Sequence, residues 1–115
     1  MQNYSKELIA ASTIPNVLSI LKRGDNYGYK IIKEVQEISE GALKWKEGSL
    51  YPVLTKLEKN KLISSYIKTE NGRNRKYYTL NDTVMSFLTQ LQSEWQSLHE
   101  IMQKIWRPQN PLIFE

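Results

Sequence analysis

The chain has 115 residues with 16 Lys and Arg against 12 Asp and Glu, a net charge of +4, and a hydrophobic content of 40%. This is enough for one core, so we expect one domain with an appendage. The absence of cysteine excludes disulfides and thiolate metal sites, and we expect neither a metal ion nor a cofactor. No N-terminal stretch resembles a signal peptide, and no apolar run approaches the roughly 20 residues that cross a bilayer, so we expect a cytoplasmic protein without a membrane partner.

The first predicted helix covers residues 5–23, where hydrophobic residues recur at helical spacing until Gly24 ends the pattern. Pro15 interrupts it, because proline lacks the amide donor and its ring crowds the carbonyl four residues back. Two interpretations remain open. The helix kinks at Pro15, or it begins near Thr13 as N-cap with Pro15 in its first turn. We favour the kink.

The second predicted helix runs from about Tyr27 to Ser39 and has its aliphatic residues on one side and charged residues on the other. Asp25 or Asn26 would serve as its N-cap, because short polar side chains accept bonds from the free amides of the first turn. The helix should stop before Gly41.

The third predicted helix starts between Glu47 and Ser49, and Pro52 is tolerable there because first-turn amides have no intrahelical partner. Its aliphatic residues point inward. The opposite side carries hydroxyl, aromatic and ammonium groups, which are the types that contact base edges and phosphates. The alternative is an ordinary amphipathic helix with a solvated side. The candidate DNA contacts on this helix are Ser49, Tyr51, Thr55, Lys56 and Lys59.

From residue 63 to residue 80 the hydrophobic period changes to two, which predicts two strands. Asn71-Gly72 between them is a strong hairpin signal, because both residues tolerate the positive φ of a type I′ turn. Two strands alone are only marginally stable, so they must pack on the three helices. The predicted fold is therefore mainly α with a small antiparallel β-hairpin, arranged as a winged helix-turn-helix.

The positive charge is concentrated in one segment. Residues 56–76 carry seven Lys and Arg against two Asp and Glu, whereas residues 1–55 carry seven against six. A local excess of cations attracts a polyanion by releasing its counterions. Taken alone, the excess fits a solvated hairpin equally well, because charged edges protect strands from pairing with other chains. The candidate phosphate contacts are Lys68, Arg73, Arg75 and Lys76.

The last predicted helix covers residues 82–105, with Asn81 as its cap, and carries hydrophobic residues at seven-residue steps. Its apolar stripe is too long for the core that precedes it, so we expect a second copy to cover it in a homodimer. The alternative, in which it folds back on the first helix, is compatible with dimerisation. Two-fold symmetry would match a palindromic DNA operator with half-sites about 34 Å apart or a multiple of that. The expected interface residues are Val84, Leu88, Leu91, Trp95, Leu98, Met102 and Ile105.

Three segments together resemble the PadR-type transcriptional regulators, which are winged-helix repressors of bacteria. They are Gly28–Ile31, Gly48–Glu58 with the following Leu62-Ile63, and Gly72–Leu80. The resemblance covers residues 8–82. The single long C-terminal helix looks like that of the short subfamily, whose multidrug-responsive members dimerise through their first and fourth helices.

In those members a flat cavity at the dimer interface takes planar, often cationic, aromatic molecules between two tryptophans. The resemblance places Trp95 at the position of that tryptophan, with Leu8, Ala11 and Pro15 facing the cavity. From the residues alone, a single aromatic on an apolar stripe is more often part of a core. Trp45 and Trp106 are expected to be packing anchors of that kind.

The chain departs from the family pattern at a few positions. The family has Gly where Lys61 stands, so we expect Asn60 to supply the left-handed residue after the third helix. Pro15 stands where the drug-binding members keep an unbroken helix. The family's Leu-Thr before the last helix is Leu80-Asn81, and both Thr and Asn cap helices.

These observations predict a DNA-binding domain at residues 1–80, a dimerisation helix at 81–106 and an extended tail at 107–115. The hypothesis is a dimeric repressor of its own gene or of a transporter or stress gene, released by a small hydrophobic or aromatic ligand. An enzyme is rejected, because the chain lacks convergent acid, base or nucleophilic groups and has one His. The alternatives are a winged-helix adaptor for proteins and an architectural DNA binder without sequence preference or ligand.

Overall fold

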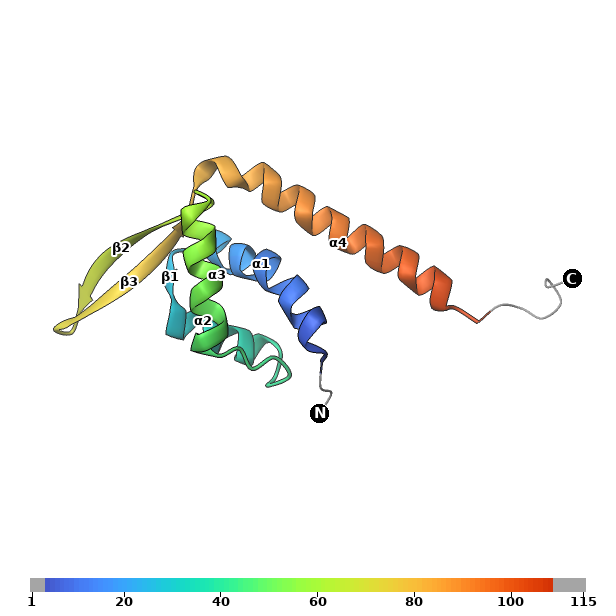
Figure 1. Ribbon diagram of the computed structural model, residues 1–115, viewed down its shortest axis with the longest axis horizontal. Helices are drawn as coiled ribbons and strands as arrows, with labels where there is room; N and C mark the ends of the chain where they lie inside the picture. The colour runs from blue at the N-terminus through green and yellow to red at the C-terminus, as the bar shows by residue number, and fades with distance from the viewer. Residues whose placement is uncertain (1–3, 109–115) are drawn as a thin grey trace, which may run out of the picture.

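A computed structural model describes residues 4–108. It consists of four α-helices, one three-stranded antiparallel sheet and a short 3-10 turn (Figure 1). No helix in this range is both long and apolar enough to cross a membrane. In chain order the elements are α1 (Lys6–Lys22), β1 (Asn26–Tyr27), α2 (Gly28–Ile38), α3 (Glu47–Lys59), β2 (Ile63–Glu70), β3 (Arg73–Leu80), η1 (Asp82–Val84) and α4 (Met85–Trp106).

Helix α1 passes through Pro15 without ending. Its N-cap is Ser5, whose hydroxyl accepts a bond from the Leu8 amide at 3.2 Å. The alternative start near Thr13 is therefore wrong. The Thr13 hydroxyl instead donates to the Ile9 carbonyl at 2.7 Å, one helical turn back.

The sheet has one strand more than the sequence predicted. Asn26 pairs with Tyr78 of β3 and Tyr27 with Tyr77, which gives the order β1-β3-β2. The prediction that Asn26 or Asp25 caps α2 is wrong, because the N-cap is Tyr27 and it makes no side-chain cap. The Asn26 amide group is used elsewhere and donates to Glu34 at 3.2 Å.

Helix α3 ends in a Schellman motif. The Leu62 amide donates to the Leu57 carbonyl and the Lys61 amide to the Glu58 carbonyl, each at 3.0 Å. This pattern requires the left-handed residue at position 61, and Lys61 has φ 63° whereas Asn60 has φ −86°. The prediction that Asn60 would take this conformation is wrong, because Leu62 must follow the turn directly to pack on the core.

The hairpin turns at Asn71-Gly72, where φ is 51° and 76°, as a type I′ turn requires. Residues Ile63 to Glu70 pair in register with Leu80 to Arg73. We call this hairpin the wing. Figure 1 shows it projecting from one side of the helices.

The core lies where α1, α2, α3, the inner end of the wing and the start of α4 meet. Trp45 belongs to it, as expected of a packing anchor. Its buried hydrophobic residues are Val17, Leu18, Ile20, Leu21, Ile31, Val35, Trp45, Leu50, Leu54, Leu57, Ile63, Tyr78, Val84 and Leu88.

Helix α4 starts in the core and then leaves it (Figure 1). Asn81 stands at the N-cap position of η1, which leads into α4, but its side chain makes no cap. Its side-chain amide donates to the Lys61 carbonyl at 2.6 Å, and its side-chain oxygen accepts from the Ser64 hydroxyl at 2.7 Å. That predicted cap is wrong. Trp106, expected to be a packing anchor, is 64% exposed in this single chain. Of the predicted tail at 107–115, residues 109–115 lie outside the described range.

Candidate nucleic-acid interface

One side of α3 is exposed along its whole length. The five residues predicted to contact DNA lie on this side, which we call the α3 row. Tyr51 is 40% exposed, and its ring lies over Gly28 at the start of α2, where an added Cβ would come within 2.7 Å of the tyrosine oxygen. Burial raises the pKa of Tyr51. The tyrosine thus joins the helix-turn-helix pair and presents an uncharged hydroxyl. The α3 row consists of Ser49, Tyr51, Thr55, Lys56 and Lys59.

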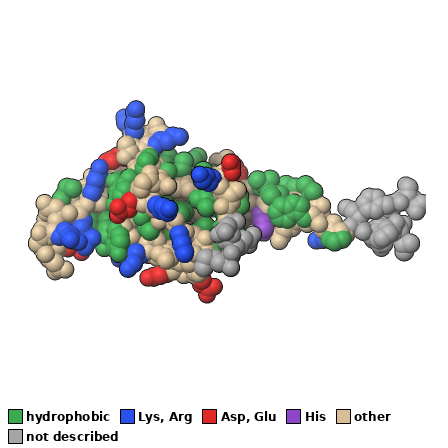
Figure 2. All heavy atoms as spheres, turned by 60° about the horizontal axis from the view of Figure 1, so that its bottom comes forward, with side chains coloured by type: hydrophobic (Ala, Val, Ile, Leu, Met, Phe, Trp, Pro, Cys, Tyr) green, Lys and Arg blue, Asp and Glu red, His purple; other side chains and the backbone are tan. Residues whose placement is uncertain are grey.

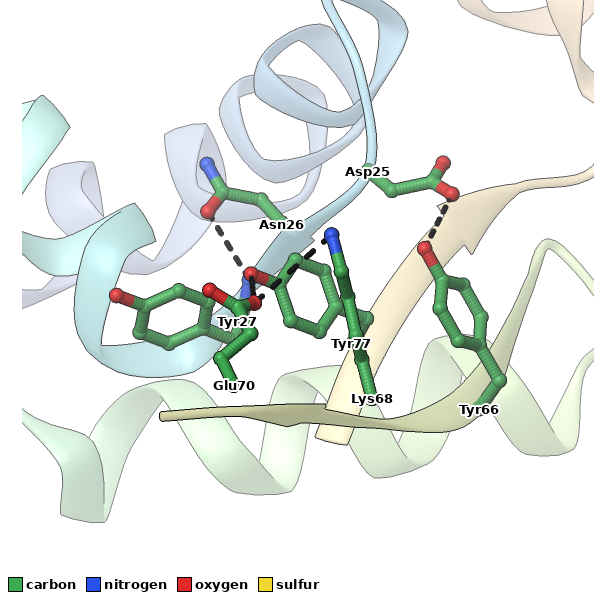
Figure 3. A network of polar contacts seen from close by, with 7 residues as sticks. All are labelled: Asp25, Asn26, Tyr27, Tyr66, Lys68, Glu70 and Tyr77. Carbon is green, nitrogen blue, oxygen red and sulfur yellow. Dashed lines mark hydrogen bonds and ion pairs between the residues drawn. The ribbon is translucent and has the colours of Figure 1, made fainter. Parts of the chain in front are cut away.

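On the face of the wing that points away from α3, Tyr66 and Tyr77 lie beside Tyr27 of β1, and the Tyr77 ring contacts both of the others (Figure 3). Tyr27 and Tyr77 meet edge to face at 5.2 Å between ring centroids, and Tyr77 stacks on Tyr66 at 5.7 Å. We call this surface the tyrosine face. The Tyr66 hydroxyl donates to Asp25 at 2.7 Å, which ties the wing to the loop after α1.

Hydrogen bonds to carboxylates favour the neutral form of Tyr77 and Tyr66. The Tyr77 hydroxyl donates to Glu70, and this bond raises the pKa of Tyr77 to about 12. The bond to Asp25 likewise raises the pKa of Tyr66. Bonds from the Thr79 and Tyr66 hydroxyls lower the pKa of Asp25. The raised pKa values of Tyr77 and Tyr66 and the lowered pKa of Asp25 all favour the hydrogen-bonded network.

Two of the predicted phosphate contacts lie on the tyrosine face. The Arg75 guanidinium stacks on Tyr27 at 4.4 Å from the ring centroid, and the Lys68 ammonium lies 5.1 Å from that of Tyr77. Lys68 also pairs with Glu70 at 3.9 Å (Figure 3). Stacking fixes where Arg75 points while leaving its donors available to a phosphate, whereas Lys68 must leave Glu70 before it can bind one.

Lys76 lies on the other face of the wing, toward α3. Its ammonium is 3.6 Å from a Glu58 carboxylate oxygen, and the other oxygen of Glu58 accepts a bond from Ser65. Arg73 is exposed next to the turn. The four predicted wing cations therefore do not form one cluster, and Lys76 must exchange an internal partner before it can bind a phosphate.

Two exposed cations near α3 were missed by the sequence reasoning. Lys44 and Lys46 stand on either side of buried Trp45, directly before the helix. The sequence Lys44-Trp45-Lys46 could have indicated them, because a buried tryptophan between two lysines holds both lysines at the surface. Figure 2 shows Lys and Arg side chains over the folded body, and hydrophobic side chains around the His of the projecting helix.

The four predicted ligand contacts are only partly brought together. Pro15 and Trp95 line the same pocket of about 610 Å³ between α1 and α4. Leu8 lines a neighbouring pocket that shares Ser12 with the first, and Ala11 is exposed at the surface of α1.

The seven predicted interface residues of α4 change from buried to exposed along the helix. Val84 and Leu88 are buried in the chain's own core, and Leu91, Trp95 and Met102 are half-buried. Leu98 and Ile105 are 52% and 71% exposed. The first turns of α4 thus hold it to this chain, and its outer half presents an open apolar stripe.

The model of the transcriptional regulator PadR-like family matches residues 17–90. A transcriptional regulator from Clostridium thermocellum is similar in structure, with 30% identity and a TM-score of 0.81 over 90% of this chain and 99% of that one. A PadR family transcription regulator from Clostridium difficile R20291 is 33% identical, with a TM-score of 0.74 over 84% and 99%. The Escherichia coli K12 transcriptional regulator YqjI is 36% identical over 56 residues, 49% of this chain and 26% of that protein.

Proposed function

The chain belongs to the PadR-like family of transcriptional regulators, and we propose that this DNA-binding regulator acts as a homodimeric repressor of its own or a transporter or stress gene. A small hydrophobic or aromatic ligand at the dimer interface would release it from a palindromic operator. A member of this family is a regulator of transcription and not an enzyme.

The observation that carries the DNA contacts is the α3 row beside a wing of stacked cations. Thr55 and Lys56 are exposed in the C-terminal half of α3, on the side that a helix lying in the major groove would turn toward base edges. Arg75, held by Tyr27, would bind a phosphate next to the groove or enter the minor groove. The expected half-sites lie about 34 Å apart or at a multiple of that distance.

The open half of α4 supports the dimer. Leu98 and Ile105 lie one above the other on a stripe that continues the buried residues Val84 and Leu88. An apolar stripe of this length is most readily covered by the same stripe of a second copy. The pocket that holds Pro15 and Trp95 borders this stripe and would become part of the interface.

The test is selection of bound fragments from random DNA, followed by anisotropy titrations of two variants. Arg75→Ala should weaken binding to all sequences and reduce the salt slope by about 1, whereas Thr55→Ala should relax the preference among sequences. Unchanged affinity and slope for Arg75→Ala would refute the wing assignment. Affinity without preference would indicate an architectural protein, and no DNA binding at low salt would indicate an adaptor.

The ligand is tested by a planar aromatic dye. It should quench Trp95 fluorescence and lower DNA affinity together, because coupling between two sites is reciprocal. Quenching without loss of DNA affinity would show that the dye binds near Trp95 without affecting DNA binding.

A further inference from the structure

A second cavity lies on the other side of α1, between that helix and the start of α3. It has a volume of about 560 Å³ and shares no lining residue with the pocket of Pro15 and Trp95. We call it the α1–α3 cleft. Its size falls within the range of about 300–1,000 Å³ that small-molecule sites occupy.

The walls of the α1–α3 cleft differ chemically from its rim. Ile9, Trp45 and Val53 supply an apolar lining, whereas three lysines, Lys6, Lys44 and Lys46, stand around it. The lysine residues are exposed, and none of the lining side chains is acidic. The ammonium groups therefore have no carboxylate partner within the cleft, and their positive potentials add over one apolar surface.

The Trp45 side chain gives a second reason to expect a polar guest here. Trp45 is only 8% exposed, and its indole N–H has no acceptor among the described residues. A buried donor without a partner is unusual in a native core. Trp45 lines the cleft while its indole nitrogen has almost no accessible surface, so an oxygen atom of a guest would reach this donor only after the lining moves.

We propose that the α1–α3 cleft binds an amphipathic carboxylate, with its hydrocarbon part against Trp45 and its carboxylate among the three lysines. The amides of the first turn of α3 add partial positive charge next to the cleft, and the Glu47 carboxylate in the same turn offsets part of it. A neutral or cationic molecule with the same hydrocarbon part would gain the apolar contact and lack the charge contact.

The cleft also adjoins the DNA-reading surface. Ser49 lines the cleft and belongs to the α3 row, and Lys46 is the N-cap of α3. A bound carboxylate would place negative charge at the end of α3 that approaches DNA and so lower DNA affinity. This last step rests on the proposed function, whereas binding of the carboxylate itself does not.

The direct test uses the full chain without DNA and Trp45 as reporter, in a Trp95→Phe, Trp106→Phe background. Octanoate, octanol and octyltrimethylammonium are titrated while the emission of Trp45 is followed. Octanoate should bind more tightly than both. Lys44→Gln with Lys46→Gln should weaken octanoate binding about two- to thirtyfold, since each of the two exposed ion pairs contributes about 0.2–1 kcal/mol.

Two variants separate charge from shape. The control pair Lys22→Gln and Lys104→Gln removes the same charge away from the cleft and should leave octanoate binding unchanged. Ala10→Phe fills the cleft without changing charge and should abolish the Trp45 response, with circular dichroism confirming the fold. Equal binding of all three probes, equal loss in both lysine pairs, or full binding to Ala10→Phe overturns the proposal.

The DNA step is read separately. Octanoate should lower DNA affinity of the parent and not of Ala10→Phe. If octanoate binds but does not lower DNA affinity, the carboxylate site stands and its coupling to DNA binding is refuted. If the chain binds octanoate but no DNA, only the proposed function is refuted.

Discussion

Replacement of Glu58 by Gln should strengthen DNA binding. Lys76 is held by Glu58 at 3.6 Å on the α3 side of the wing, with the lysine side chain 52% exposed. In the proposed DNA complex Lys76 must leave this carboxylate before it binds a phosphate, and the negative charge of Glu58 would repel the DNA backbone. Glutamine removes the negative charge and keeps an oxygen that accepts the Ser65 hydroxyl.

The size of the effect follows from counterion release. If Lys76 gains one full phosphate contact, the slope of log K against log salt steepens by about 0.9, which corresponds to about eightfold tighter binding near 0.1 M salt. The ratio of variant to parent affinity should change about 3.5-fold between about 50 and 200 mM salt.

The assay is fluorescence anisotropy with labelled DNA at several salt concentrations. Glu94→Gln, which makes the same charge change on exposed α4, should leave affinity and slope close to the parent. Lys76→Gln should flatten the slope more in the Glu58→Gln background than in the parent, because only there is Lys76 free. A Glu58→Gln variant that unfolds like the parent and binds DNA with unchanged or lower affinity would refute the reasoning.

Three further predictions concern stability. Lys61→Gly should raise the free energy of unfolding, measured by urea titration, by about 1 kcal/mol, because glycine adopts the φ of 63° without strain. The control Lys59→Gly, inside α3, should lower it by a similar amount. No gain in stability for Lys61→Gly would show that the backbone at position 61 is not strained. Leu88→Ala should lower the free energy of unfolding by about 2–5 kcal/mol, because Leu88 is fully buried. Leu98→Ala should mainly weaken self-association measured by sedimentation, because Leu98 is 52% exposed. If Leu98→Ala instead unfolded more easily and Leu88→Ala only weakened self-association, the assignment of the two halves of α4 would be contradicted. Because the pKa of Tyr77 is raised from 10.0 to about 12, the contribution of its neutral hydroxyl to folding stability is complete below pH 10.0 and is lost as the pH rises to about 12. The free energy of unfolding of Tyr77→Phe should therefore fall less than that of the parent over this pH range. Equal falls in the two proteins would exclude the bond from Tyr77 to Glu70 as the cause of the pH dependence.

The parts of the fold that depend on local sequence could be predicted. The period of two and Asn71-Gly72 determine the wing, because a type I′ turn and paired strands need only neighbouring residues. The exposed α3 row followed from the spacing of Leu50, Leu54 and Leu57 in one helix.

The parts of the fold that depend on residues distant in the sequence could not be predicted. Both Asn26 and Asn81 have the side chain of a typical helix cap. Asn26 instead pairs with β3, and the Asn81 side-chain amide donates to the Lys61 carbonyl. The ion pair of Lys76 with Glu58 joins a strand to a helix, so charge counting could not show that this cation has a partner. Lys61 adopts a glycine-like conformation because Leu62 is needed in the core, which sequence preference at position 60 does not reveal.

The outer part of the wing has a consequence for how such proteins diverge. Strand β1 pairs with β3 only at Tyr77 and Tyr78, and beyond them the side chains of Arg75 and Lys76 reach Tyr27 and Glu58. From Asn74 to the turn the ribbon is held by the pairing of its two strands. Adding or deleting one residue on each side of Asn71-Gly72 would alter its reach by about 3.4 Å and leave every inner side chain on its present face. A change in one strand only would turn the outer residues over. Wing length can therefore vary in matched steps while the tyrosines stay in place.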